Sequence, residues 1–106
     1  MSPKKSSKED YKSYTSDELF NYFTEALFEH NIDFAEKCIE ELIRRVDQNE
    51  ISSEDEKIKY LKAMGLFQEM INNDEKAREY FLRVLDIKPD DEESITHINR
   101  LSGLET

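Results

Sequence analysis

Residues 58–91 read IKYLKAMGLFQEMINNDEKAREYFLRVLDIKPDD, and this stretch decides the fold. Its apolar residues recur three and four positions apart, as in amphipathic helices, and the pattern breaks once, at Asn72-Asn73-Asp74. Pro89 closes the second run, because proline cannot continue a helix and disfavours helical geometry in the residue before it. The stretch therefore predicts two helices joined by a tight turn. The first helix is apolar nearly all round, which indicates burial on several sides.

Four residues of this stretch have mechanical reasons for their places. Gly65 lets the second helix approach the first because no side chain stands between them, and Ala77 does the same from the facing helix. Phe81 fills the gap one turn further on, and Pro89 ends the pair. At these residues, in this order and register, the stretch resembles a tetratricopeptide repeat, a helix-turn-helix unit of about 34 residues.

Two helices are predicted before this stretch. Thr15 and Glu18 are spaced as a capping box that begins a helix near Ser16, and Asn31 is a suitable cap for the next helix. Arg45 lies in the last turns of that second helix, where a cation offsets the negative helix end. The connection between the helices is short, so they should pack antiparallel. Their apolar residues are Leu19, Phe20, Tyr22, Phe23, Ala26, Leu27 and Phe28, followed by Phe34, Ala35, Cys38, Ile39, Leu42, Ile43 and Val46.

A fifth helix is predicted after Pro89. Ile95, Ile98 and Leu101 lie on one of its faces, and Gly103 is a reasonable stop. The remaining cap signals are Ser53 with Glu56 in the acidic connector, Asn72 with Glu75 in the turn, and Asp90 before the last helix.

The resemblance extends weakly to the rest of the chain. Residues 16–49 match as a degenerate repeat in which Ala35 corresponds to Ala77, at a longer spacing than the family's unit, and the last helix corresponds to the family's cap helix. The clear repeat itself departs from the family at Gln68, where an aromatic residue is usual, and at Val84, where alanine is usual. The resemblance implies an all-α fold, a right-handed α–α superhelix of about five antiparallel helices.

The expected organisation is one helical domain of this kind over residues 15–104, preceded by a disordered Lys- and Ser-rich tail over residues 1–14. A net charge of −10 in 106 residues opposes binding to nucleic acid and to anionic lipid. Cys38 is the only cysteine and is expected to be a buried thiol. No apolar run approaches a membrane span and no secretory signal is present, so we expect no membrane insertion and a cytoplasmic location.

The resemblance implies a non-catalytic protein–protein interaction module of the adaptor, scaffold or co-chaperone type. Such repeats bind a peptide or helix of a partner in a concave groove lined by the first helix of each pair. The positions that transfer to this groove are Phe20, Thr24, Leu27, Lys59, Lys62, Leu66, Glu69, Thr96 and Arg100. Lys59, Lys62, Leu66 and Glu69 form one stripe with no evident structural role.

The cations among these positions indicate one class of partner and the pattern of the first helix argues against another. We expect Lys59, Lys62 and Arg100 to attract an acidic or C-terminal carboxylate partner. The family's clamp for chaperone tails is not expected, because Phe20 and Thr24 stand where it needs Lys and Asn.

The alternative to a binding module is a self-associating structural subunit that forms a homodimer through exposed Phe20, Phe28 or Phe67. We expect neither an enzyme nor a cofactor. His30 and His97 are the only histidines, each predicted as a surface or turn residue, and no metal-site spacing or phosphate loop is present.

Overall fold

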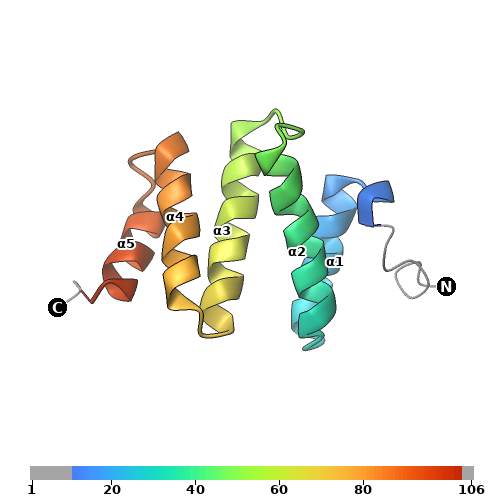
Figure 1. Ribbon diagram of the computed structural model, residues 1–106, viewed down its shortest axis with the longest axis horizontal. Coiled ribbons are helices and arrows are strands. Elements are labelled where there is room, and N and C mark those ends of the chain that lie inside the picture. Colours follow the sequence, from blue (N-terminus) through green and yellow to red (C-terminus); the bar gives the residue numbers. More distant parts are fainter. Residues whose placement is uncertain (1–10, 104–106) are drawn as a thin grey trace. The chain divides into compact units, whose positions relative to one another are not determined.

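The computed structural model describes residues 11–103, and this part of the chain is entirely helical (Figure 1). The elements are the 3-10 helix η2 (Tyr11–Ser13) and the α-helices α1 (Ser16–Phe28), α2 (Ile32–Asp47), α3 (Glu54–Met70), α4 (Asp74–Ile87) and α5 (Glu92–Leu101). The predicted all-α class is confirmed, and none of the described residues forms a strand. The described residues divide into two compact units, of which the first ends at Gln48 and the second begins at Asn49.

The first unit is an antiparallel hairpin of α1 and α2. The predicted capping box of α1 is confirmed: the Thr15 hydroxyl accepts from the Glu18 N–H at 3.0 Å, and the Glu18 carboxylate accepts from the Thr15 N–H at 2.8 Å. Cys38 is a buried thiol, as predicted. The buried side chains of the hairpin are Leu19, Phe23 and Ala26 from α1 and Ala35, Cys38, Ile39, Leu42, Ile43 and Val46 from α2.

The last residues of the expected tail are part of this unit. The sequence predicts disorder for residues 11–14, but Tyr11–Ser13 forms η2, and the rings of Tyr11 and Tyr14 lie 6.1 Å from Phe34 and 5.2 Å from Tyr22. Residues 1–10 of the predicted tail lie outside the described residues.

The second unit is a hairpin of α3 and α4 followed by α5. Gly65 allows the close approach that the sequence predicts, since a Cβ built there would stand 2.8 Å from two atoms of the Phe81 ring. Ala77, Phe81 and Val84 of α4 are buried. Pro89 follows shortly after the end of α4, and the preceding Lys88 has an extended backbone (φ −133°, ψ 89°), as the prediction required.

The two hairpin turns have the same geometry. In the first, His30 has φ 61°, its N–H donates to Leu27 O at 3.1 Å, and the Asn31 N–H donates to Ala26 O at 2.8 Å. In the second, Asn72 has φ 64°, its N–H donates to Glu69 O at 3.0 Å, and the Asn73 N–H donates to Gln68 O at 2.8 Å. Each is a Schellman ending with a left-handed residue after the helix.

Two predicted caps are wrong by one residue. The N-cap of α4 is Asn73, because Asn72 occupies the left-handed position of the turn. The N-cap of α5 is Asp91, whose carboxylate accepts from the Ser94 N–H at 3.0 Å. In both cases two adjacent residues of the same type compete for the cap, and only the backbone geometry separates them.

Candidate binding surface on the second unit

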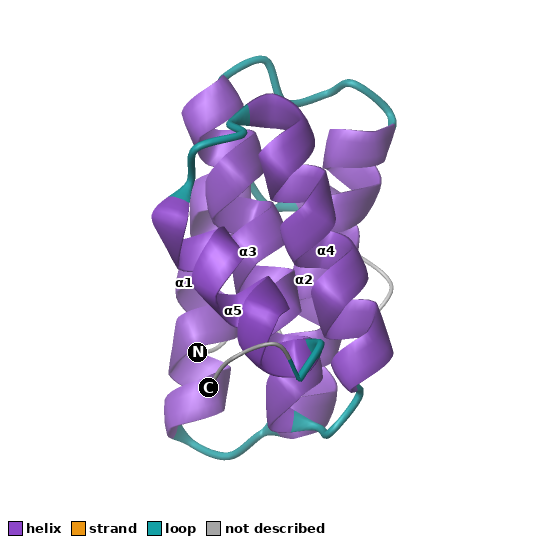
Figure 2. Cartoon of the chain, turned by 90° about the vertical axis from the view of Figure 1, so that its left-hand side faces the viewer, coloured by secondary structure: helices purple, strands orange, loops and turns teal. Residues whose placement is uncertain are grey.

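The candidate surface is the side of α3 that faces α5. Lys62, Leu66 and Glu69 lie on one stripe of α3, because residues three and four apart share a helix face. Figure 2 shows α5 in front of α3, with α4 beside them, and side chains of α5 reach both Lys62 and Glu69.

The first ion-pair cluster joins the middle of α3 to the beginning of α5. The Lys62 ammonium lies 3.0 Å from Asp91 Oδ1 and 2.8 Å from Glu93 Oε1. Burial favours a lower pKa for Lys62, but hydrogen bonds and attraction from Glu93 and Asp91 outweigh it and raise its pKa. Burial likewise favours a higher pKa for Asp91, but hydrogen bonds from Ser94 and Lys62 outweigh it and lower its pKa. Each charge of the Lys62–Asp91 pair therefore stabilises the other.

The second cluster joins the end of α3 to the middle of α5. Glu69 accepts from Arg100 with both carboxylate oxygens at 2.8 Å, and its Oε2 lies 2.8 Å from His97 Nδ1. The His97 ring also stacks on Phe81 of α4, with 4.5 Å between ring centroids and 6° between planes. His97 was predicted as a surface or turn residue, but it is half-buried and holds α5 to both neighbouring helices.

Apolar side chains are exposed between and beside these clusters. Leu66 lies one turn from Lys62 and close to one turn from Glu69, and it is 45% exposed; Met70, at the end of α3, is 49% exposed. Large apolar residues at helical spacing on one surface form a patch that an apolar group of a partner can cover.

The structure gives this stripe the structural role that the sequence did not show. Lys62 and Glu69 bind α5, and Arg100 is paired with Glu69, so three of the nine predicted groove residues hold the second unit together. Lys59 is exposed and lies 5.6 Å from the ring centroid of Tyr60, and Thr96 is exposed on α5.

The predicted groove residues of α1 belong to the first unit. Phe20 and Leu27 are half-buried, and Thr24 is exposed with its hydroxyl donating to Asn21 O at 2.9 Å.

The aromatics proposed for a homodimer differ sharply in exposure. Phe28 is 88% exposed, whereas Phe67 is only 1% exposed and is part of the core. The prediction that Phe67 is an exposed contact is wrong, since the α3 pattern is apolar on too many sides to reveal which face is covered.

Arg45 is the residue that the sequence pattern missed most clearly. The sequence predicts only a cation that offsets a helix end, but Arg45 is buried, and its guanidinium bonds Glu41 at 2.9 Å and Tyr14 O at 2.7 Å. Burial favours a raised pKa for Glu41, but hydrogen bonds from Arg44 and Arg45 outweigh it and lower its pKa. The guanidinium also donates to Ser16 Oγ and to the carbonyls of Tyr11 and Lys12.

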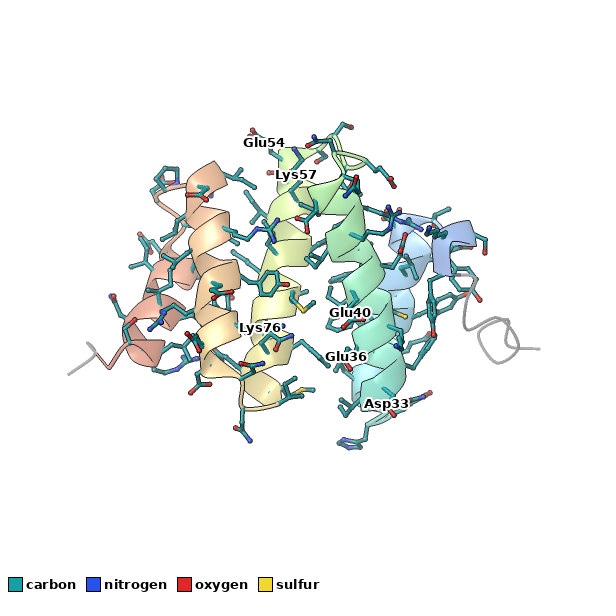
Figure 3. All side chains as sticks on the ribbon, viewed as in Figure 1. Asp33, Glu36, Glu40, Glu54, Lys57 and Lys76 are labelled. Carbon is teal, nitrogen blue, oxygen red and sulfur yellow. The ribbon has the colours of Figure 1, made fainter. Side chains whose placement is uncertain are left out.

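Acidic side chains line a separate face of the first unit. Asp33, Glu36 and Glu40 follow one side of α2 at helical spacing (Figure 3).

No group of three or more His, Cys, Asp or Glu side chains within residues 11–103 is arranged to hold a metal ion. Among these same residues, no helix is long and apolar enough to cross a membrane.

The chain matches no protein-family model, and neither the curated proteins nor the solved structures contain a match to it.

Proposed function

We propose that the chain is a non-catalytic protein–protein interaction module that binds a peptide or helix of a partner on the α3–α5 surface. The observation that supports this most directly is the exposed apolar pair of Leu66 and Met70 on the side of α3 that α5 shares. The ion pairs with α5 favour one geometry of the surface, which lowers the entropy cost that a partner would meet on binding.

The finer proposal is that the two hairpins stack as tetratricopeptide repeats, with α1, α3 and α5 as groove helices. The matching turns and the burial of the corresponding residues Ala35 and Ala77 support it. In that arrangement Phe20, Thr24 and Leu27 would extend the surface. Small-angle X-ray scattering tests the stacking: a profile that fits only two independently oriented units would exclude it.

The proposed surface is tested by affinity capture from a native lysate with quantitative mass spectrometry. We expect proteins captured by the wild-type chain to be lost with Leu66→Asp. The matched control is Leu82→Asp on α4, because Leu82 is 46% exposed and Leu66 is 45% exposed. If the Leu66→Asp variant captures the same proteins as the wild-type chain while circular dichroism shows a native fold, this surface is excluded.

A second candidate is a homodimer through Phe28, whose ring is almost fully exposed at the end of α1. The exposed ring offers a large apolar area that a second copy of the chain could cover. Light scattering after size-exclusion chromatography separates the candidates: a dimer that Phe28→Asp converts to monomer supports the structural subunit, and a monomer supports the binding module.

A further inference from the structure

We propose that the α3–α5 surface takes a cationic segment of a partner protein, in which one large apolar side chain is flanked by Lys or Arg residues. This inference rests on the proposed function and reverses the acidic or C-terminal carboxylate partner that Lys59, Lys62 and Arg100 suggest in the sequence.

The first step is the charge of the cluster at the beginning of α5. One cation, Lys62, faces two carboxylates, Asp91 and Glu93, so the cluster carries a net negative charge. The Glu93 side chain is 59% exposed, whereas that of Asp91 is 9% exposed. Glu93 is therefore the carboxylate that an incoming cation can reach.

The second step is that two of the three cations predicted to attract an acidic partner, Lys62 and Arg100, are already paired. Arg100 donates to both oxygens of Glu69, and Lys62 is held between its two carboxylates. An acidic partner would have to displace one of these internal carboxylates, and each displaced carboxylate would then lack its cation. A cationic partner adds to the pairs without breaking any of them.

The third step is the position of the apolar pair. Leu66 lies between the two clusters on α3, and Met70 continues the same side of the helix. An apolar anchor placed on Leu66 brings flanking residues of the partner to within a turn of each cluster. The chain's net charge of −10 attracts the same class of partner over longer distances.

The test is selection from libraries of random dodecapeptides displayed once with free C-termini and once with blocked C-termini, against the full chain. We expect enrichment of peptides with Lys or Arg around Leu, Ile, Met or Phe, independent of a free carboxylate. Binding of the enriched peptides should weaken as NaCl is raised. Leu66→Asp should weaken them by about ten-fold or more, as for the loss of a central anchor.

Matched variants separate the charge from the surface. Glu93→Lys should weaken the cationic peptides, whereas Glu79→Lys, the same change at an exposed site on α4, should not; Leu82→Asp controls for Leu66→Asp. Acidic or carboxylate-dependent peptides that still require Leu66 would overturn this inference and leave the proposed surface standing. No enrichment, or enriched peptides indifferent to Leu66→Asp, would overturn both.

Discussion

At the scale of single residues, two positions of the fold tolerate few substitutions, Gly65 and Arg45. Gly65 is the point at which α3 meets the ring of Phe81, and no larger residue fits there without movement. Arg45 is a buried cation whose donors are used by Glu41, Ser16 and backbone carbonyls of residues 11–14. One site depends on the absence of a side chain and the other on a full set of partners.

Gly65→Ala is expected to destabilise the chain by about 1–3 kcal/mol, because the new Cβ would overlap the Phe81 ring. Alanine is the better helix former by about 1 kcal/mol, so the sign of the change reports which effect dominates. Urea unfolding followed by circular dichroism measures it. In a Phe81→Leu background the same substitution should cost less; a stabilising effect in the wild-type chain would show that the ring moves freely.

Arg45→Ala is expected to cost about 3 kcal/mol of unfolding free energy, because it leaves the buried Glu41 carboxylate with one cation and removes donors from the η2 carbonyls. Arg44→Ala is the matched control, since Arg44 bonds the same carboxylate from a side chain that is 35% exposed. The control should cost about 1 kcal/mol or less. Equal losses in urea unfolding would mean that burial of Arg45 contributes little.

At the scale of elements, α5 differs from the other helices in how it is held. Ser94 is its only fully buried residue. The two ion-pair clusters join it to α3, and the stack of His97 on Phe81 joins it to α4. The α3–α4 pair is held instead by apolar residues such as Leu61, Phe81 and Val84. Ionic contacts are weakened by salt and by changes of protonation, so α5 should be the first helix of the second unit to open.

Glu69→Gln is expected to speed amide hydrogen exchange in α5 several-fold, because it removes the charge that Arg100 and His97 share. The Glu69–Arg100 ion pair is partly exposed and contributes about 1 kcal/mol of stability at most, so hydrogen exchange in α3 and α4 should change little. Exchange measured by mass spectrometry checks this, with Glu79→Gln on α4 as the control. Uniform acceleration across the whole unit would show that α5 has no separate opening.

The stability of both units should fall at acid pH. Burial opposes ionisation of Glu41 and Asp91, but their hydrogen bonds prevail and lower their pKa values. The stability that they contribute is present above the usual carboxyl pKa of about 4 and is lost as the pH falls through the lowered values. Urea unfolding between neutral and strongly acid pH should show a shallower decline for Asp91→Asn, which keeps the cap. An unchanged pH profile would contradict the role of Asp91.

At the scale of the whole molecule, the two hairpins are variations on one design. Corresponding positions share turn geometry and burial, as Leu19 and Leu61 illustrate. The aromatic side chain comes from a different helix in each hairpin: Phe23 of α1 corresponds to Gly65 of α3, and Ile39 of α2 corresponds to Phe81 of α4. In the second hairpin the Phe81 ring lies against the backbone of α3 at Gly65.

The shared turn makes a paired prediction. His30→Gly should stabilise the chain by about 0.5–1 kcal/mol, because glycine adopts a positive φ without the strain of a side chain. Asn72→Gly should gain less, since asparagine tolerates this conformation better than histidine. Thermal unfolding measures both, with Lys37→Gly inside α2 as a control that should lose about 1 kcal/mol. Destabilisation by His30→Gly would mean that the imidazole itself is needed.

Local sequence signals predict where the helices lie and most of what ends them. Thr15 and Pro89 act on neighbours a few residues away, and the apolar period marks the buried face of each helix whatever packs against it. The contacts between α3 and α5 were not predicted in this way, because Lys62, Glu69 and Arg100 are all good surface residues when taken alone. Only the tertiary structure pairs α3 with α5 across the whole of α4. The same reason hides Arg45, whose partners on η2 and at the start of α1 are close in space but distant along the chain.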